Sequence, residues 1–193
     1  MSTSEWALIQ RLKARNADRR LATDGEGRRA RPVSPTTLKN VQIVERAIGF
    51  RLPALLRAIY LKVGNGGFGR VYGVMGTGAL RSCYRDMLKL EKENFVWRWP
   101  RHLLPLANYG CGMWSCVDCE YERLPMILWD PNNLDEELEG SDARLNWGNA
   151  FWDQGKSFRR WWEDWLAGKE ERDPRWPSDA WTKKRLGFVL PKE

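Results

Sequence analysis

The 193-residue sequence contains a single histidine, His102, and no long apolar run. Any multi-histidine metal centre is therefore excluded, and a Ser-His or Cys-His hydrolase would have to use this one residue. The absence of about 18 consecutive apolar residues excludes a membrane-spanning helix. The first twenty residues lack a continuous apolar core and a small-residue cleavage site, so we expect no secretory signal.

Cysteine is scarce, with four residues in the chain. Without an export signal they are expected to be reduced thiols, which predicts a cytoplasmic protein. The spacing Cys111-x4-Cys116-x2-Cys119 resembles a zinc or redox cluster, with Cys83 or His102 as the only soft fourth ligand. Because Cys116 and Cys119 are an odd number of residues apart on a predicted strand, they should face opposite ways. We favour core cysteines and no metal, with Cys111 as a reactive thiol and a cysteine- or zinc-dependent enzyme as an alternative.

The glycine-rich stretch GNGGFGRV, residues 64–71, fits the G-x-G-x-x-G pattern of nucleotide-binding loops. A dinucleotide site needs a strand before these glycines and a helix after them. Here an apolar helical pattern precedes the loop, and the strand lysine, H-R-D and D-F-G motifs of kinases are missing. The pattern therefore predicts the end of a helix, with no bound nucleotide or other cofactor.

Charge is distributed unevenly along the chain, whose formal net charge is +7. Residues 1–39 hold nine Lys or Arg and four Asp or Glu, a balance of +5. Residues 118–142 hold nine acidic residues and one arginine, a balance of −8. The sequence therefore describes a nearly neutral body with a basic N-terminal arm and an acidic strip.

Hydrophobic periodicity predicts an α+β fold with helices at both ends and neighbouring strands between them. Helices are expected at residues 6–22, 35–48, 53–63, 84–95 and 158–166, and strands at 68–74, 103–109, 113–120 and 126–129. In the first helix, Trp6, Ile9 and Leu12 should lie near one face. Ser34-Pro35 and Ser157 are typical of helix N-termini. The tryptophans of FRRWWEDWL recur at helical spacing, which favours core packing over ligand stacking.

Several short motifs follow one another along the chain. They are Glu45-x-x-Ile48-Gly49-Phe50, Leu52-Pro53, Asn65-Gly66-Gly67, Leu104-Pro105-Leu106-Ala107, Gly110-x-Gly112, Cys116-x-Asp118, Leu124-Pro125-Met126-Ile127 and Ser157-Phe158. In this order the chain resembles the SUKH superfamily of Smi/Knr-type domains over about residues 35 to 168. That superfamily contains bacterial toxin-immunity proteins and a yeast regulator of cell-wall synthesis.

The resemblance implies a single SUKH-type domain at residues 34–170, with an antiparallel-rich mixed sheet flanked by helices. A basic arm with a short helix, 1–33, precedes it, and a tail, 171–193, is expected to dock through its tryptophans. The resemblance also implies a non-enzymatic protein with no catalytic residues. Its expected role is to bind and neutralise a cognate polymorphic toxin, such as a nuclease, in the bacterial cytoplasm.

The acidic strip is the predicted partner-binding surface, since carboxylates complement the basic cleft of a nuclease. The predicted contact residues are Asp130, Asp135, Glu136, Glu137 and Glu139. Trp97 and Trp99 alternate with Arg98 and are expected to be partly exposed, as aromatic anchors for a partner. The alternative function is nucleic-acid binding by an accessory protein, through the basic residues of positions 1–34.

Overall fold

The computed structural model describes residues 2–18, 32–70, 72–93, 98–134, 148 and 150–169. Residues 19–31 of the expected basic arm and the expected tail, 171–193, lie outside these ranges. The helices are α1 Thr3–Ala17, α2 Leu38–Ile48, α3 Ala54–Lys62, α4 Thr77–Glu93, the 3₁₀ helix η1 Pro131–Asn133 and α6 Phe158–Leu166. The strands are β1 Leu103–Gly110, β2 Met113–Asp118, β3 Pro125–Trp129 and β4 Phe151–Ser157.

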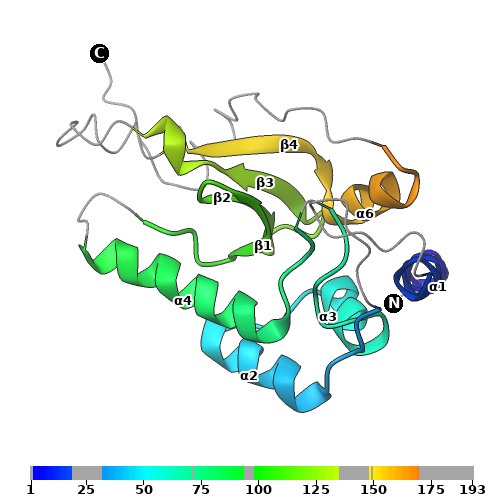
Figure 1. Ribbon diagram of the computed structural model, residues 1–193. Helices are drawn as coiled ribbons and strands as arrows, with labels where there is room; N and C mark the ends of the chain where they lie inside the picture. Colours follow the sequence, from blue (N-terminus) through cyan, green and yellow to red (C-terminus); the bar gives the residue numbers. More distant parts are fainter. Residues whose placement is uncertain are drawn as a thin grey trace.

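The four strands form one antiparallel sheet in the order β1-β2-β3-β4. Helix α4 packs against β1 and α2, and α6 packs against β3 and β4. Figure 1 shows the sheet with α4 and α2 beneath it and α6 and α1 beside the end of β4. This arrangement confirms the α+β class, with helices flanking an antiparallel sheet.

The helices around the glycine loop begin and end for local reasons. Helix α2 ends at Gly49, whose φ of +85° is the left-handed conformation that glycine adopts without strain. Its start differs from the prediction, because Thr37 rather than Ser34 caps it, accepting a hydrogen bond from the Asn40 backbone N–H. Helix α3 follows Pro53 directly, as expected.

The glycine loop is a connection between α3 and α4. A side chain at Gly66 would meet the Gly76 backbone nitrogen at 2.2 Å, so two backbone segments touch there. The Asn65 side-chain oxygen accepts a 2.9 Å hydrogen bond from the Thr77 N–H at the start of α4. This cap explains why α4 begins at Thr77, seven residues before the predicted start. The helix precedes the loop, as the sequence predicted.

The strand predicted at residues 68–74 is wrong for the residues that the structure describes there. Those residues form bends and turns, with a single bridge between Val74 and Ala107. Gly69 and Gly73 have φ values of +108° and +83°, which interrupt an extended backbone. Conversely, β4 was not predicted, because its sequence FWDQGKS lacks a clear alternation of apolar and polar residues.

Helix α1 begins earlier than predicted, since Ser2 and Glu5 form a reciprocal capping box at its start. Ile9 and Leu12 are buried as expected, together with Leu8. Trp6 is not on this packed face. Its side chain is 46% exposed, and the Lys62 ammonium lies 4.6 Å from its ring centre.

The tryptophan helix α6 is part of the hydrophobic core, as its periodicity predicted. Phe158, Trp161 and Trp162 have no exposed surface, and Phe68 stacks on Trp162 with ring centres 5.5 Å apart. Trp161 and Trp162 meet edge to face at 5.1 Å. Burying an aromatic side chain of this size contributes about 1.5–3 kcal/mol to stability. Core packing therefore accounts for these tryptophans without a ligand.

Candidate functional site

The turn between β1 and β2 projects from one end of the sheet. Gly110, Cys111 and Gly112 all have positive φ values, of +85°, +48° and +76°. The Asn108 side-chain oxygen accepts a 2.6 Å hydrogen bond from the Gly110 N–H and fixes the entry into this turn. Cys111, a non-glycine residue in the left-handed region, is exposed at the turn.

Asp130 lies beside this turn, at the end of β3. Its carboxylate accepts hydrogen bonds from the Asn132 backbone N–H at 3.0 Å and from the Asn132 side-chain amide at 2.7 Å. The same amide donates to the Cys111 carbonyl at 3.0 Å. Asn132 therefore joins the segment after β3 to the β1–β2 turn. Asp130, one of the predicted contact residues of the acidic strip, therefore has a defined position at the end of β3.

Tyr72 supplies an exposed aromatic ring next to the same turn. Its side chain is 50% exposed, and a methyl group at Gly110 would lie 3.6 Å from its ring. We call Tyr72, Asn108, Cys111, Asp130 and Asn132 the hairpin-tip surface. Sequence reasoning did not find Tyr72, although its position between Val71 and Gly73 in a glycine-rich loop is typical of an exposed side chain.

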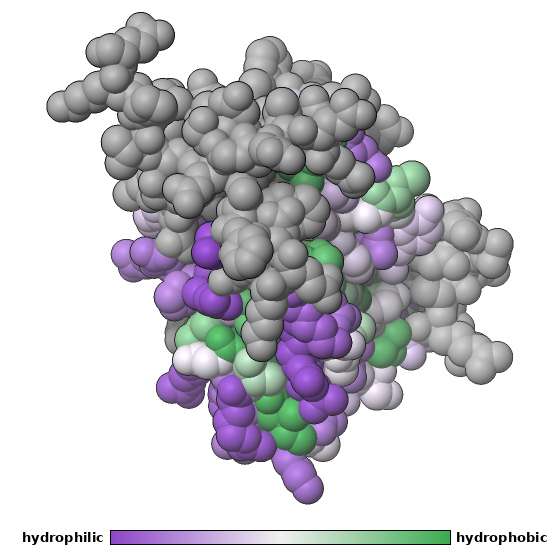
Figure 2. Space-filling view, turned by 90° about the vertical axis from the view of Figure 1, so that its left-hand side faces the viewer, coloured by the Kyte–Doolittle hydropathy of each residue, from purple (hydrophilic) through white to green (hydrophobic). Residues whose placement is uncertain are grey.

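The side of the molecule that carries this end of the sheet is largely hydrophilic where described residues are drawn, with small apolar patches between polar side chains (Figure 2). A flat apolar interface is not present on this visible part. Polar and charged side chains therefore dominate this visible part.

The predicted contact residues have different outcomes. Asp130 lies on the hairpin-tip surface, half-buried. Asp135, Glu136, Glu137, Glu139 and Trp97 lie outside the described residues. The predicted exposure of Trp99 is wrong: it is 3% exposed, and its indole N–H donates to the Leu103 carbonyl at 2.9 Å. Its ring packs against Trp129 and Phe151, so Trp99 supports the sheet from within the core.

The cysteines and His102 do not form a joint site in the part of the chain that the structure describes. No group of three or more His, Cys, Asp or Glu side chains there could hold a metal ion. Burial raises the pKa of Cys83 to about 12, with the Asp86 carboxylate as a second cause, and burial raises the pKa of Cys116 too. His102 is partly exposed, and its Nδ1 atom lies 3.7 Å from the Glu120 carboxylate.

A groove of about 1380 Å³ lies at the opposite end of the sheet from the hairpin-tip surface. The start of α1, residues 51–55, the β2–β3 turn and the β4–α6 junction line it. Its charged residues have both signs, including Arg51, Glu122, Arg123, Lys156 and Arg160. Arg51, Glu122 and Arg123 are exposed.

Helix α1 contains part of the basic arm that the alternative function, nucleic-acid binding, would use. Among its basic residues, Arg11 and Lys13 are exposed, whereas the Arg15 guanidinium lies 5.2 Å from the Trp165 ring centre. The remaining arginines of the arm, from Arg19 to Arg31, lie outside the described residues. Since Leu8, Ile9 and Leu12 are buried, α1 turns one face to the core and its charges outward.

A family model described as the SMI1 / KNR4 family (SUKH-1) matches residues 35–178, which are 144 of the 193 residues. The protein belongs to this family. The match confirms the sequence-based resemblance, and α1 precedes the matched region. The SUKH-1 family includes toxin-immunity proteins. A comparison with curated proteins found no match. No described helix has the length and apolar character needed to cross a membrane.

Proposed function

We propose that this SUKH-1 protein is a non-enzymatic immunity protein that binds and neutralises a cognate toxin in the bacterial cytoplasm. Family membership is compatible with this role, and the hairpin-tip surface supports it. The supporting observation is the exposed Tyr72 ring beside a turn that Asn132 ties to Asp130. A surface that presents an aromatic side chain and a carboxylate suits contact with a protein.

The contact surface in this proposal continues from Asp130 into Asp135, Glu136, Glu137 and Glu139. Clustered carboxylates accelerate association with a basic surface, because attraction acts before contact. A toxin that binds a phosphate backbone, such as a nuclease, has such a surface. Tyr72 would act after encounter, since buried tyrosines often contribute strongly to the lifetime of a complex.

The test uses the purified toxin domain encoded beside this protein in its host genome. Association and dissociation rates are measured for the wild type, for Tyr72→Ala, and for a charge variant. The charge variant carries Asp130→Asn, Glu136→Gln, Glu137→Gln and Glu139→Gln. We expect the charge variant to associate about tenfold more slowly at low salt. We expect Tyr72→Ala to dissociate about tenfold faster, which corresponds to about 1.4 kcal/mol.

Asp130→Asn keeps an oxygen that can accept the hydrogen bond from Asn132, so the turn should survive. Glu122→Gln is the matched control, because Glu122 is an exposed carboxylate at the other end of the sheet. Equal rates for the wild type, the charge variant and Tyr72→Ala would reject the hairpin-tip surface. Failure of the wild type to bind or inhibit that toxin would reject the immunity role with it.

A further inference from the structure

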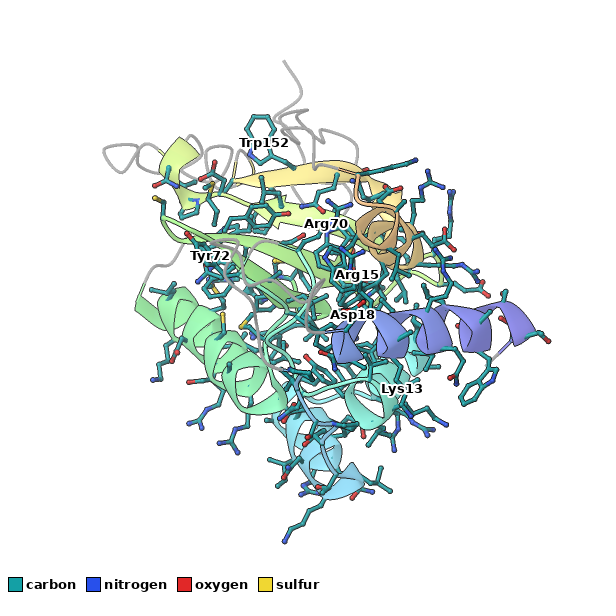
Figure 3. The ribbon with its side chains drawn as sticks, turned by 45° about the vertical axis from the view of Figure 1, so that its right-hand side comes forward. Lys13, Arg15, Asp18, Arg70, Tyr72 and Trp152 are labelled. Carbon is teal, nitrogen blue, oxygen red and sulfur yellow. The ribbon has the colours of Figure 1, made fainter. Side chains whose placement is uncertain are left out.

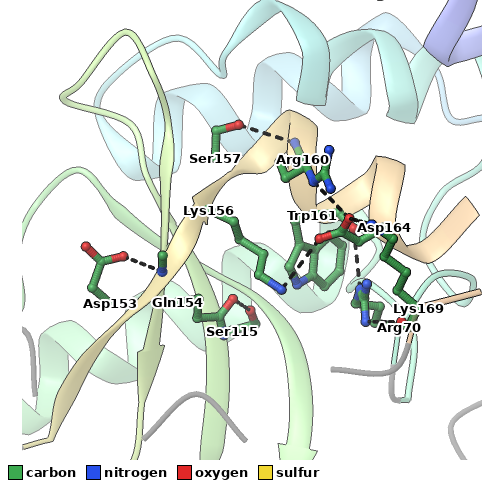
Figure 4. A network of polar contacts seen from close by, with 11 residues as sticks. Arg70, Ser115, Asp153, Gln154, Lys156, Ser157, Arg160, Trp161, Asp164 and Lys169 are labelled. Atoms are coloured by element: carbon green, nitrogen blue, oxygen red, sulfur yellow. Dashed lines mark hydrogen bonds and ion pairs between the residues drawn. The ribbon is translucent and has the colours of Figure 1, made fainter. Parts of the chain in front are cut away.

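One carboxylate of α6 is surrounded by several cations. The Asp164 carboxylate lies 2.9 Å from Arg160 Nε, 3.7 Å from Lys169 Nζ and 3.8 Å from Lys156 Nζ. The Asp164 side chain is 13% exposed, so these contacts are partly shielded from water. Figure 4 shows the four side chains together with Arg70 and Trp161.

Arg70 adds a buried guanidinium to this group. It is 6% exposed, its Nε donates to the Trp161 carbonyl at 3.4 Å and its Nη1 donates to the Lys169 carbonyl at 3.1 Å. Its Nη2 atom is buried without a hydrogen-bond acceptor, and so is the indole Nε1 of Trp161. Within the described part of the chain, no carboxylate forms an ion pair with Arg70.

The cluster has more positive charge than Asp164 neutralises. Arg160, Lys169 and Lys156 all approach the one Asp164 carboxylate, and Arg70 hydrogen-bonds the Lys169 carbonyl beside them. Even when only Arg70, Arg160 and Lys169 are counted against Asp164, an excess of two positive charges is left. Arginine cannot lose its proton in a protein, so Arg70 cannot escape the cost of burial by becoming neutral. A buried charge without an opposite charge destabilises the fold.

Capping of α6 explains only part of this arrangement. The Lys169 carbonyl follows the C-terminal end of α6, where a guanidinium satisfies free carbonyl groups and the helix dipole. This role uses Nη1 of Arg70, while Nε donates to the Trp161 carbonyl inside α6. It leaves Nη2 unpaired, and carbonyl groups carry no net charge to balance Arg160 and Lys169.

We propose that Arg70, Arg160 and Lys169 bind a phosphate-type oxyanion beside Asp164. A phosphate dianion would offset an excess of at least two positive charges, and its oxygens can accept hydrogen bonds from several donors at once. Arg160 and Lys156 also line the groove near the β2–β3 turn, so the cluster borders that groove. Asp164 holds the exposed Arg160 and Lys169 side chains in place.

This site is independent of the proposed toxin contact. Arg70 and Tyr72 belong to one turn, in which the Gly73 N–H donates to the Arg70 carbonyl at 2.8 Å, but their side chains contact different elements. The Arg70 side chain binds the Trp161 carbonyl of α6, whereas the Tyr72 ring lies beside the β1–β2 turn. Figure 3 shows Arg70 near α6 and Tyr72 farther to the left, away from α6. Loss of anion binding should therefore leave the contacts at Tyr72 and Asp130 unchanged.

The test is a titration of the full chain with inorganic phosphate at constant ionic strength. Calorimetry measures the heat of binding, and thermal unfolding measures the change in Tm. We expect saturable heat and a saturable rise in Tm that equivalent chloride does not produce. The double variant Arg160→Gln/Lys169→Gln should bind phosphate at least about tenfold more weakly, because it loses two charged donors. Both side chains are about half exposed, so the variant should fold.

Arg159→Gln is the matched control. Arg159 is the neighbouring arginine of α6, but it pairs with Glu163 and Ser4 outside the cluster. Its substitution should leave phosphate affinity unchanged. The Arg70 Nε–H resonance in ¹⁵N spectra of the wild type should shift when phosphate is added. This measurement reports on Arg70 without a substitution that would remove its hydrogen bond to the Lys169 carbonyl.

Glycerol 3-phosphate provides the second arm of the titration. Tighter binding than inorganic phosphate would assign the site to a phosphate monoester, and weaker binding would assign it to the free ion. The proposal fails if neither probe gives a saturable signal above chloride. It also fails if the double variant binds phosphate as well as Arg159→Gln does.

Discussion

The four cysteine residues lie in different environments, and the environment sets the reactivity of each thiol. Cys116 has no exposed surface, and burial raises its pKa well above its ordinary value. Burial also raises the pKa of Cys83, to about 12, and that of Cys119. Cys111 is exposed in the β1–β2 turn. The thiolate is the reactive form, and burial opposes its formation at Cys83, Cys116 and Cys119. Cys111 differs from these three because a reagent in solvent can reach it directly.

Alkylation should therefore distinguish these thiols in the folded protein. With iodoacetamide at pH 8, we expect Cys111 to react first and Cys116 to react about a hundredfold or more slowly, since it requires opening of the core. Peptide mass spectrometry at timed intervals measures both rates. Cys111→Ser should remove the fast phase, and rapid labelling of Cys116 in the native state would contradict its burial.

At the scale of elements, α1 is joined to the domain by one buried amide as well as by apolar packing. Asn16 is 5% exposed, and its side-chain nitrogen donates to the carbonyls of Val33 at 2.9 Å and Val63 at 3.0 Å. Its oxygen accepts from the Val33 N–H at 3.4 Å. Helix α1 thus meets the segment before α2 and the end of α3, although it precedes the region that the family model matches.

Asn16→Leu should lower the free energy of unfolding by about 2–3 kcal/mol, because backbone groups at Val33 and Val63 would stay buried without their partner. Urea denaturation with circular dichroism measures this loss. Arg11→Ala is the control on the exposed face of the same helix, with an expected change within about 0.5 kcal/mol. Equal stability of both variants would show that α1 does not depend on Asn16 for its attachment.

At the scale of the whole molecule, several buried acids are kept neutral by the core. Tyr60 has no exposed surface, its hydroxyl donates to the Met75 carbonyl at 2.8 Å, and burial raises its pKa. The pKa values of Cys83, Cys116 and Cys119 are raised in the same way. The unfolded chain releases these protons near the ordinary values of 9.0 for cysteine and 10.0 for tyrosine.

Alkaline pH should therefore destabilise the fold. A raised pKa of an acid in the native state gives stability that is present below the unfolded pKa and is lost as pH rises above it. For Cys83 the window is about pH 9 to 12. We expect the urea midpoint to be steady from pH 7 to 8.5 and to fall from pH 9 to 11. Cys116→Ala should fall less steeply than the wild type, and parallel curves would contradict a neutral Cys116.

Sequence reasoning was most successful where structure follows from neighbours along the chain. Helix ends at Gly49 and Ser157, the helix before the glycine loop and strands β1 to β3 follow from caps, turns and periodicity. It failed for β4, whose alternation is broken by Gly155 and charged residues, and for the glycine-interrupted residues 68–74. Of the candidate site, it placed Asp130 in the loop after a strand and missed Tyr72.

The amino-acid sequence by itself determined the fold class, the family and the core role of the tryptophan helix, because those depend on ordered local patterns. Only the tertiary structure decided which aromatic residues are exposed: Trp99 is covered by Trp129 and Phe151, and the Tyr72 side chain is half exposed. It also decided the setting of Arg70, whose hydrogen-bond partner Lys169 is 99 residues away. Burial and charge balance are properties of neighbours in space, and no spacing along the chain specifies them.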